Sequence, residues 1–440
     1  MGSIKNLIPQ SLLKLLRPLY HGSLALAASF YYARPSGGMT VIGVTGTAGK
    51  STTTMMLAWI LNASGKKCGY ITTVGFGNGD EDIINKHGVS MPGGPLLQKQ
   101  LGQMLNNGCK YAVVECTSEG LAQSRHLGIN FDVALFTNLS HAHVEAHGSF
   151  GNYQQAKAKL FSAMQKGKKK SFFPEKTIGV NLDDPMSGYF LSFFADKKFG
   201  VTFKGVKARS AQKVFEAGFV KDGMPQEFEI DKITFTLNLP GQFNAQNAGL
   251  AVACANMLGV DLTQAAKALR DFTGVRGRME NVPNNLGVKI IVDFGCEPAS
   301  FNSALEAAAQ MPHNRLIQVF GSTGGARDKS KRFEFGKTAA QYADYIIVTN
   351  DDVYESDPEE IAGNIEQGIK SFKLRQPAYE IVLDRRTAIA KALTLAQKDD
   401  LILITGKGSE QFLVLPQNKR IEWDEVSVVK EQLLKISNFK

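Results

Sequence analysis

Cysteine is scarce in this sequence. The 440 residues include five cysteines, at positions 68, 109, 116, 254 and 296, and their spacing pairs none of them. This scatter argues against a disulfide framework and against a zinc site built on cysteines. It is typical of a reducing compartment, so we expect a cytoplasmic protein.

Long hydrophobic runs are also lacking. The most apolar stretch, from Leu24 to Tyr32, is too short to span a bilayer, and Pro35 follows it closely. We expect residues 1–40 to form a short apolar helical segment that packs on the protein or lies at an interface, with peripheral membrane contact as one option. A folded domain begins at once after this segment, at about residue 41, which favours the cytoplasm over a secreted protein with a signal peptide.

Concentrated charge is absent apart from one basic run. The formal net charge is +9, but the basic residues are spread along the chain except for KGKKK at 166–170, which we interpret as a solvated loop. A phosphate-handling enzyme also needs cations in its cleft. We therefore expect small-molecule substrates and no nucleic-acid partner. We also expect a monomer.

The order of apolar segments predicts an α/β protein with two main domains. Buried strands are expected at 111–118, 132–140 and 176–184, alternating with helices, and five further short apolar runs follow residue 274. The boundary falls in FTGVRGRMENVP, where glycines, charges and a proline cluster. We predict a central mononucleotide-binding domain with a parallel sheet over 41–273 and a Rossmann-like α/β domain over 274–440.

The segment VTGTAGKSTTT, residues 44–54, predicts a phosphate-binding turn between a strand and a helix. Glycines allow close backbone approach, the first helical amides point at an anion, a lysine adds charge, and a hydroxyl can face magnesium. The strict pattern G-x-x-x-x-G-K-[ST] is not met, because its first glycine falls on Val44. The residues that we expect to bind the nucleotide here are Gly46, Thr47, Gly49, Lys50, Ser51 and Thr52.

Polar residues end the neighbouring strands. Glu115 is followed by Thr117 and Ser118, and histidines stand at 141, 143 and 147. These side chains favour a magnesium site over a dedicated zinc site, because the phosphate loop and hard oxygen ligands are close by. Lys157 and Lys159, on an expected helix, have the spacing of surface lysines.

The second domain carries two glycine turns with cations. GSTGGARDKSKR places Arg327 and Asp328 directly after a strand, which suits an anionic substrate group but is also compatible with an exposed basic loop. TGKGSEQF places Lys407 and Glu410 after the last strand and is a weak signal by itself. Arg278, in the boundary segment, is either a solvated hinge residue or one that closes a nucleotide cleft.

These motifs, in this order, resemble the Mur ligase family of ATP-dependent amide-forming enzymes in peptidoglycan precursor synthesis. The resemblance covers about residues 41–430 and is strongest to the members that add the third residue, a diamino acid, to UDP-N-acetylmuramoyl-L-alanyl-D-glutamate. The segments that carry it are VTGTAGKSTTT, VVECTSEGL, FTNLSHAHVEAHG, YQQAKAKLF, VNLDDP, GQFNAQNA, RGRME, VDFGCEPAS, GSTGGARDKSKR, VTNDDVYESDP, LDRRTAI and ITGKGSE.

The resemblance implies roles for individual residues. Lys50 and Ser51 would hold the ATP phosphates and a first magnesium ion, while Glu115 and His143 would hold a second. Lys157 matches a lysine that such ligases carry as a carbamate, which would make it a metal-binding anion. The nucleotide would also be bordered by Asn244, Asn247, Arg278 and Asp293. Substrate groups would be handled by Ser90, Thr117, Ser118, Arg327, Asp328, Asp351, Asp352, Tyr354, Lys407 and Glu410.

The implied reaction is phosphorylation of a carboxylate by ATP to an acyl phosphate, followed by attack of an amine. Four departures from the family pattern are visible. The chain has only about 40 residues before the phosphate loop, where the family has a uridine-binding domain. D-N-P-R of the diaminopimelate-specific members is replaced by Asp351 to Tyr354, D-Y-A-H by Asp293 to Cys296, and an aspartate by Ala142.

These departures keep alternatives open. One is a related carboxylate-amine ligase, similar to folylpolyglutamate synthase or acting on a lipid-linked wall precursor. Another is a nucleotide-binding partner protein that has lost activity. The amine is open between diaminopimelate, lysine and others, because the arginine of D-N-P-R would clamp a carboxylate.

Overall fold

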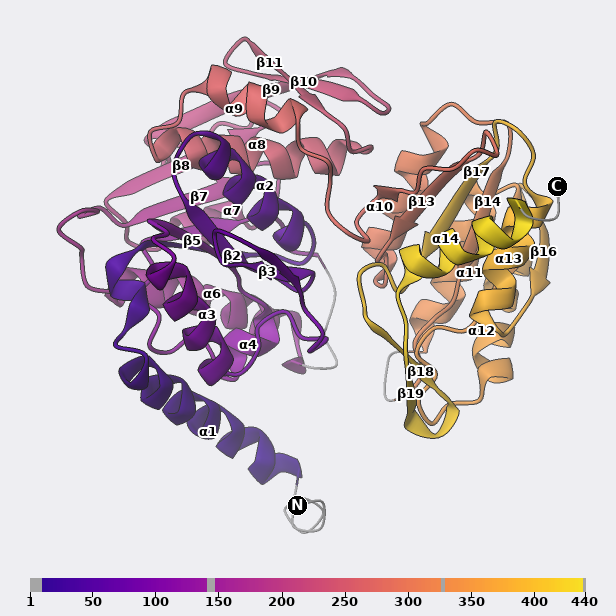
Figure 1. Cartoon of the computed structure of the whole chain (residues 1–440), viewed down its shortest axis with the longest axis horizontal. Helices are drawn as coiled ribbons and strands as arrows, with labels where there is room; N and C mark the ends of the chain where they lie inside the picture. Colours follow the sequence, from indigo (N-terminus) through magenta and orange to yellow (C-terminus); the bar gives the residue numbers. More distant parts are fainter. Residues whose placement is uncertain (1–9, 141–146, 326–328, 438–440) are drawn as a thin grey trace. The chain divides into compact units, whose positions relative to one another are not determined.

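The computed structural model describes residues 10–140, 147–325 and 329–437 of the chain, with side chains from 16 to 436. Two compact units share these residues (Figure 1). Unit 1 comprises Met1–Gly218, Phe228–Phe235 and Gln246–Phe272, and unit 2 comprises Phe219–Glu227, Thr236–Ala245 and Thr273–Lys440. The α/β fold class predicted from the sequence is confirmed.

The first sheet has the strand order β11-β10-β9-β8-β7-β6-β1-β5-β2-β3-β4 among the described residues. Its strands are β1 Thr40–Thr45, β2 Cys68–Ile71, β3 Gly75–Gly77, β4 Asp82–Ile84, β5 Tyr111–Glu115, β6 Val133–Phe136, β7 Thr177–Asn181, β8 Lys197–Thr202, β9 Lys213–Lys221, β10 Gln226–Ile230 and β11 Ile233–Leu237. Pairing is parallel from β2 through β5, β1, β6, β7 and β8 to β9. The carboxyl ends of β5, β1 and β6 therefore lie side by side, which is where an open α/β sheet binds its ligands.

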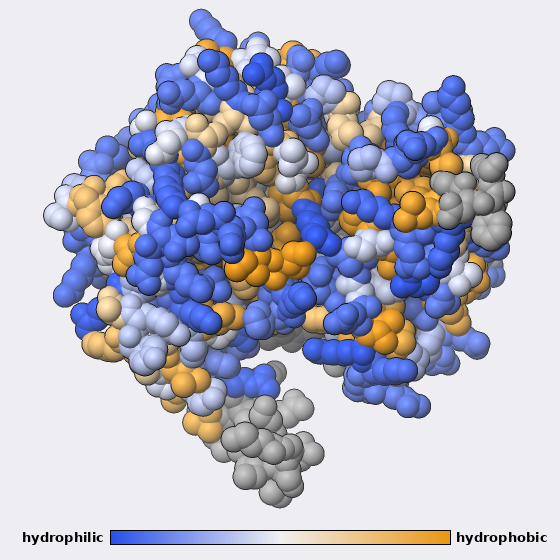
Figure 2. Space-filling view, in the orientation of Figure 1, coloured by the Kyte–Doolittle hydropathy of each residue, from blue (hydrophilic) through white to orange (hydrophobic). Residues whose placement is uncertain are grey.

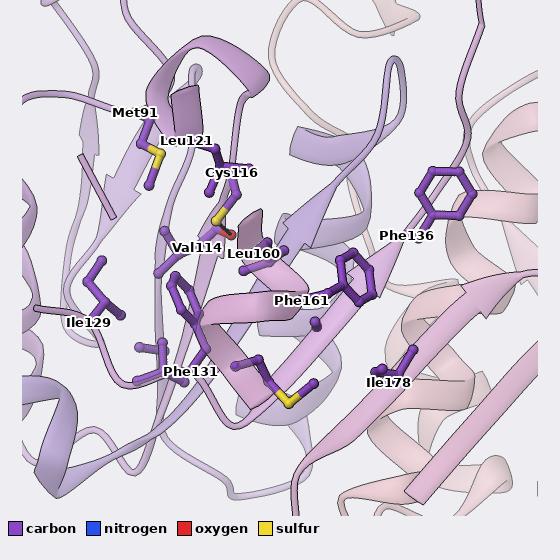
Figure 3. Close-up of a cluster of buried hydrophobic side chains, with 14 of the residues drawn as sticks. Met91, Val114, Cys116, Leu121, Ile129, Phe131, Phe136, Leu160, Phe161 and Ile178 are labelled. Carbon is purple, nitrogen blue, oxygen red and sulfur yellow. Dashed lines mark hydrogen bonds between the residues drawn. The ribbon is translucent and has the colours of Figure 1, made fainter. Parts of the chain in front are cut away.

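Helices cover this sheet. They are α1 Gln10–Tyr31, η1 Pro35–Gly38, α2 Lys50–Ala63, α3 Gly94–Asn106, α4 Ser118–Ala122, α6 Phe150–Lys166, α7 Ser187–Leu191, α8 Gln242–Met257 and α9 Leu262–Arg270. The six residues of β1 are all buried, as expected for a β-branched strand with both faces covered. Figure 3 shows part of the core, where Phe131 and Phe136 of the β6 region meet Leu160 and Phe161 of α6.

The second sheet has the order β12-β13-β17-β14-β15-β16. Its strands are β12 Glu280–Asn281, β13 Lys289–Asp293, β14 Leu316–Phe320, β15 Tyr345–Val348, β16 Ala378–Ile381 and β17 Leu401–Thr405, with a separate pair β18 Phe412–Leu415 and β19 Lys419–Glu422. The five apolar runs predicted after residue 274 form the parallel strands β13 to β17. Helices α10 Pro298–Ala309, α11 Ser330–Tyr342, α12 Pro358–Ser371, α13 Arg385–Leu395 and α14 Glu425–Ser437, with η2 Pro416–Asn418, complete the unit.

The first sheet contains a tight turn between β2 and β3. The segment GYITTVGFG, residues 69–77, turns after Ile71 and returns as β3, antiparallel to β2. Thr72 closes this turn, donating through its hydroxyl to the carbonyl of Gly75 at 2.9 Å and accepting from the Gly75 amide at 3.0 Å.

The basic run 166–170 is not wholly a solvated loop. The Lys170 ammonium is buried, forms an ion pair with Asp132, and donates to the carbonyl of Met39 at 2.6 Å. Lys176 contacts the same carboxylate at 3.1 Å. A buried carboxylate attracts these cations because neither charge can find water there. Separately, none of the helices in the described parts of the chain combines the length and apolar character needed to cross a bilayer.

Candidate active site

The phosphate loop between β1 and α2 packs so closely against neighbouring segments that a side chain at either of its glycines Gly46 and Gly49 would clash. A Cβ added at Gly46 would lie 1.9 Å from the Thr137 hydroxyl, and one at Gly49 would lie 2.1 Å from the Asn247 side-chain oxygen. Gly49 also has φ +80°, a left-handed conformation that glycine adopts without strain. Both glycines predicted for the loop are therefore required by its geometry.

The end of β6 holds the loop in shape. The Thr47 amide donates to the carbonyl of Asn138 at 2.8 Å, and the Ala48 amide donates to the Asn138 side chain at 2.9 Å. The Thr137 hydroxyl donates to the Ala48 carbonyl at 2.7 Å. Sequence reasoning missed Thr137 and Asn138 as loop-positioning residues. The signal that could have found them is their place at the carboxyl end of a strand beside β1.

The start of α2 presents the residues expected to meet phosphate and metal. Lys50 is the first residue of the helix, and its ammonium donates to the Thr47 carbonyl at 2.8 Å. Ser51 and Thr52 follow and are buried. The free amides of a helix N-terminus and a lysine together favour an anion, so this end of α2 fits a nucleotide phosphate.

Glu115, the last residue of β5, contacts helix α2 and the turn that follows β2. Its carboxylate accepts hydrogen bonds from the Ser51 hydroxyl at 2.7 Å and from the Thr73 amide at 2.9 Å. The Thr73 hydroxyl donates to it at 3.1 Å and also contacts the Ser90 hydroxyl. The structure thus brings the predicted residues Ser51, Glu115 and Ser90 together. Thr73 was missed, although it follows β2, which is parallel to β5.

Lys157 lies behind the phosphate loop. It sits on α6, which the Ser149 side chain caps by accepting from the Asn152 amide at 3.1 Å. The Lys157 side chain is 1% exposed, and its ammonium donates to the carbonyl of Gly46 at 2.6 Å. Burial, and next the charge of Lys50, lower the pKa of Lys157 well below its ordinary value, against the opposing effect of Glu115. The spacing that suggested a surface lysine was misleading here, because residue 157 faces the sheet.

Tyr153 shares that face of α6, one turn before Lys157. Its hydroxyl and the Thr47 hydroxyl lie 3.0 Å apart, and the Lys157 ammonium lies 4.4 Å from the centre of its ring. Lys159 points away and is exposed, donating to the carbonyl of Ala122 at 3.1 Å. One turn of α6 therefore contacts the loop through Tyr153 and Lys157.

Thr117 and Ser118 begin α4. The Thr117 hydroxyl accepts from the Gly120 amide at 3.3 Å and caps the helix. The Ser118 hydroxyl lies 3.1 Å from Nε2 of His147. Burial lowers the pKa of His147, an effect that Glu119 opposes. Ser118 therefore contacts the imidazole at the end of the histidine segment, whose other two members lie outside the described residues.

The chemistry of these donors fits a magnesium nucleotide. A serine hydroxyl and a buried carboxylate, 2.7 Å apart at the start of a helix, are oxygen ligands of the kind that magnesium takes in nucleotide sites. The lowered pKa of the buried Lys157 favours the neutral amine more than in an exposed lysine. These groups meet at the carboxyl ends of β1 and β5.

Unit 2 has a second cluster, after β15 and β17. The buried Lys407 ammonium lies 2.8 Å from an Asp352 carboxylate oxygen, 2.5 Å from Glu410 and 3.8 Å from Asp351. Burial alone would lower the pKa of Lys407, but Glu410, Asp351 and Asp352 raise it above its ordinary value. Burial raises the pKa of Glu410, with Lys407 opposing. The predicted substrate residues Asp351, Asp352, Lys407 and Glu410 are thus brought together.

Arg278 and Asp293 also lie near each other in unit 2. The Arg278 guanidinium sits 4.3 Å from the centre of the Phe294 ring. The Asp293 carboxylate accepts from the amides of Met279 and Gly295, both at 2.8 Å. Burial raises the pKa of Asp293, and Arg278 partly offsets this. Asp293 therefore fixes the backbone directly after Arg278 and directly after Phe294.

The remaining predicted residues are placed as follows. Asn247 contacts Gly49 in unit 1. In unit 2, the side-chain amide of Asn244 donates to the Pro240 carbonyl at 2.8 Å. Tyr354 has φ +52° and lies against Gly325. His143, Arg327 and Asp328 lie outside the described residues, so their predicted roles stay predictions.

Comparison with known proteins identifies two family domains in the chain. A family model described as Mur ligase middle domain matches residues 44–255. A second model, described as Mur ligase, glutamate ligase domain, matches residues 277–408. The first match contains the phosphate loop, and the second contains Asp351, Asp352 and Lys407 of the second cluster.

Curated relatives cover most of the chain. A protein of Caldanaerobacter subterraneus subsp. tengcongensis, named UDP-N-acetylmuramoyl-L-alanyl-D-glutamate--2,6-diaminopimelate ligase, is 36% identical over 413 residues, covering 93% of this chain and 81% of the relative. A protein of the same name from Gloeobacter violaceus is 36% identical over 419 residues, covering 94% and 81%.

Solved structures of Mur ligases also match this chain. A UDP-N-acetylmuramoyl-L-alanyl-D-glutamate--2,6-diaminopimelate ligase matches with a TM-score of 0.60 and 26% identity, covering 91% of this chain and 79% of that one. MurF ligase from Thermotoga maritima, solved in complex with ADP, matches with a TM-score of 0.64 over 96% of this chain and 85% of that one. At 17% identity the second match concerns the fold alone.

Proposed function

Because this chain belongs to the Mur ligase family, we propose that it is an ATP-dependent, ADP-forming ligase that adds the third residue to UDP-N-acetylmuramoyl-L-alanyl-D-glutamate. ATP phosphorylates the acceptor carboxylate, giving an acyl phosphate and ADP. The amine of the incoming amino acid then attacks the acyl carbon, an amide bond forms, and phosphate leaves. The curated relatives are named for this ligation with 2,6-diaminopimelate.

One observation carries the proposal most strongly. Behind a glycine loop at a helix N-terminus, the buried Lys157 contacts the loop carbonyl of Gly46, and the loop serine, Ser51, contacts Glu115. Phosphoryl transfer needs positioning and charge neutralisation more than a protein nucleophile. Groups that can position a phosphate and groups that can neutralise its charge both contact this loop.

Different residues of unit 1 are proposed to bind the phosphates and the magnesium ions. The α2 amides and Lys50 bind and orient the phosphates, and Gly46 and Gly49 allow the backbone to approach them. Ser51, Glu115 and His143 would hold magnesium, with two ions expected. When bound, magnesium neutralises phosphate charge and orients the acceptor carboxylate. Thr73 also donates to the Glu115 carboxylate and is itself contacted by Ser90, which helps to keep the carboxylate at Ser51.

Lys157 is proposed to carry a carbamate. Its lowered pKa raises the share of the neutral amine, whose nitrogen lone pair can attack the carbon of CO₂. An N–C bond forms, one C–O π bond opens to give the carboxylate, and the nitrogen proton passes to solvent. This changes the buried neutral amine into an anion next to Lys50, where a negative charge is favoured.

The amine is proposed to be handled in unit 2. Three carboxylates surround the single ammonium of Lys407, so the cluster is acidic as a whole and suits the ammonium group of an amino acid. Tyr354 occupies the position of the arginine in D-N-P-R. Without that arginine, a second carboxylate on the amine substrate loses one bidentate partner. This supports lysine or another amine as a substrate beside diaminopimelate.

The setting of the reaction is part of the proposal. We expect the protein to be cytoplasmic, because the scattered cysteines are typical of a reducing compartment. We also expect it to be a monomer. The acceptor can be carried on UDP or on a lipid. A lipid-linked acceptor would require the enzyme to work at a membrane surface.

Mass spectrometry of a reaction mixture tests the proposal. The full chain is incubated with ATP, magnesium, UDP-N-acetylmuramoyl-L-alanyl-D-glutamate and one amine at a time. The expected result is a product whose mass equals acceptor plus amine minus water, with ADP formed in equal amount. ATP turnover without any such product, for every amine, would contradict the ligase assignment.

A further inference from the structure

We propose that the outer face of helix α1 docks this protein on the surface of an anionic lipid bilayer. The inference does not depend on the proposed ligase activity, because it rests on a helix that contributes no residue to the candidate active site. Figure 1 shows α1 at the edge of unit 1, running from the body of the unit to the N-terminal end of the described chain.

One face of α1 is fixed to the protein. Small residues line it and let the backbones approach closely: a Cβ added at Gly94, the first residue of α3, would lie 2.3 Å from Cα of Ala25. The Ser29 hydroxyl donates to the carbonyl of Gly128 at 3.0 Å, and Ala25 and Ser29 are buried. The helix is therefore held in one orientation about its axis.

The opposite face is apolar and bare. Its large side chains are far from buried: Leu19 is 69% exposed, Tyr20 61%, Phe30 63% and Tyr31 82%. Leu16 and Leu26 are each 43% exposed. At 100° per residue these six positions fall on the half of the helix that faces away from Ala25. In Figure 2, orange residues stand among paler ones on the visible part of α1.

The charge of this region points to an anionic surface. The first acidic residue of the whole chain is Asp80, so α1 carries no negative charge, whereas Lys14, Arg17 and Arg34 are positive. Arg17 and Arg34 are exposed, and the Arg34 guanidinium lies 4.3 Å from the centre of the Phe30 ring. Cations beside leucines and aromatic rings are the composition of helices that lie in the headgroup region of anionic membranes.

The tyrosines favour a bilayer over a second protein as the occupant. Tyr20 and Tyr31 lie at one edge of the apolar stripe and suit the boundary between headgroups and acyl chains, where the ring is apolar and the hydroxyl stays wet. A helix lying flat on the bilayer would bury the exposed face without crossing it. The docked face would then hold unit 1 at the membrane through α1.

Vesicle co-sedimentation of the full chain, without ATP or substrates, tests the inference. Vesicles of phosphatidylglycerol mixed with phosphatidylcholine are compared with phosphatidylcholine alone. The wild type is expected to bind the anionic vesicles more tightly and to lose affinity at about 0.5 M NaCl. Leu19→Ser with Phe30→Ser should lower the partition coefficient about tenfold or more. Arg17→Gln should lower it about fivefold on anionic vesicles only.

Phe194→Ser provides the matched control, because Phe194 is also 63% exposed but lies outside α1. Its vesicle binding should equal that of the wild type, and thermal unfolding should show that all variants remain folded. Failure of the wild type to bind either vesicle would overturn the inference. So would equal binding by the double variant, or a wild-type dimer in solution that the double variant converts to a monomer, because a second copy would then cover the face.

Discussion

The Lys157 ammonium and the carbonyl oxygen of Gly46 lie 2.6 Å apart, although 111 positions separate the two residues in the chain. The contact joins the middle of α6 to the first glycine of the phosphate loop. It places a buried amine with a lowered pKa directly behind the site proposed for phosphate. The consequences of this contact can be measured.

Lys157→Met should abolish turnover while leaving ATP binding nearly intact. The phosphates are held by the loop amides and Lys50, whereas the charge on residue 157 is needed only for phosphoryl transfer to the acceptor. We expect kcat to fall about 100-fold or more and the Kd of ATP to change about threefold at most. Phosphate release and calorimetric titration measure the two. Lys159→Met, on the exposed side of the same helix, should retain wild-type activity.

The carbamate itself has a spectroscopic signature. Wild-type protein equilibrated with ¹³C-bicarbonate should give one carbamate carbon resonance that Lys157→Met lacks. Removal of CO₂ should lower wild-type activity, and bicarbonate should restore it. Full recovery of Lys157→Met by bicarbonate would argue against a carbamate on this lysine, as would an unchanged spectrum.

Glu115→Gln should weaken the response to magnesium. The amide keeps the shape of the side chain but removes the negative charge that faces the Ser51 hydroxyl at 2.7 Å. We expect kcat to fall about 100-fold and more magnesium to be needed for half-maximal rate. The titration of phosphate release with magnesium checks this. Glu119→Gln, an exposed neighbour, is the control, and equal behaviour of the two variants would contradict the assignment.

Tyr354→Arg should shift the choice of amine toward diaminopimelate. An arginine at this position could hold the second carboxylate of that substrate in a bidentate pair. The ratio of kcat/KM for diaminopimelate over lysine is expected to rise about tenfold. Tyr354→Phe keeps the ring and should leave the ratio unchanged. A ratio unaffected by arginine would place the carboxylate elsewhere.

Asp132→Asn should destabilise unit 1. Its carboxylate contacts the buried ammonium groups of Lys170 and Lys176, which would be left without a negative partner. We expect the free energy of unfolding to fall by about 3–5 kcal/mol. Asp80→Asn breaks the exposed pair with Lys67 and should cost about 1 kcal/mol or less. Urea unfolding of both variants makes the comparison.

His126 predicts a loss of stability in acid. Burial, with a smaller effect of Lys159, lowers the pKa of His126 to about 4 in the folded protein, against an ordinary value of 6.5. Between these two values the unfolded chain binds more protons, so the free energy of unfolding falls as the pH falls from 6.5 to 4. The contribution is about 3 kcal/mol. His126→Gln should remove it, and parallel pH profiles for both proteins would contradict the assignment.

The sequence predicted the features that depend on local pattern. Runs such as VKIIVD and LILIT are β-branched and short, so they were identified as buried strands, and the glycines of the phosphate loop follow from its turn. Glu115 was found because it ends a strand. The resemblance supplied the role of Lys157, which the spacing of α6 alone could not.

What the sequence left out depends on contacts between distant segments. Thr73 and Asn138 reach the site because β2 and β6 flank the strands that carry Glu115 and the loop. The burial of Lys170 follows from where Asp132 lies, 38 positions away. The sequence could not predict which face of α1 is exposed, because Gly94 and Gly128, far along the chain, decide which side of the helix packs.

The central claim is that this site activates a carboxylate by phosphorylation, and one isotope measurement tests it directly. UDP-N-acetylmuramoyl-L-alanyl-D-glutamate with ¹⁸O in its carboxylates is turned over with ATP, magnesium and the accepted amine. Formation of an acyl phosphate predicts that one ¹⁸O atom appears in each phosphate released. Phosphate that carries no ¹⁸O, although the amide product forms, would contradict the account.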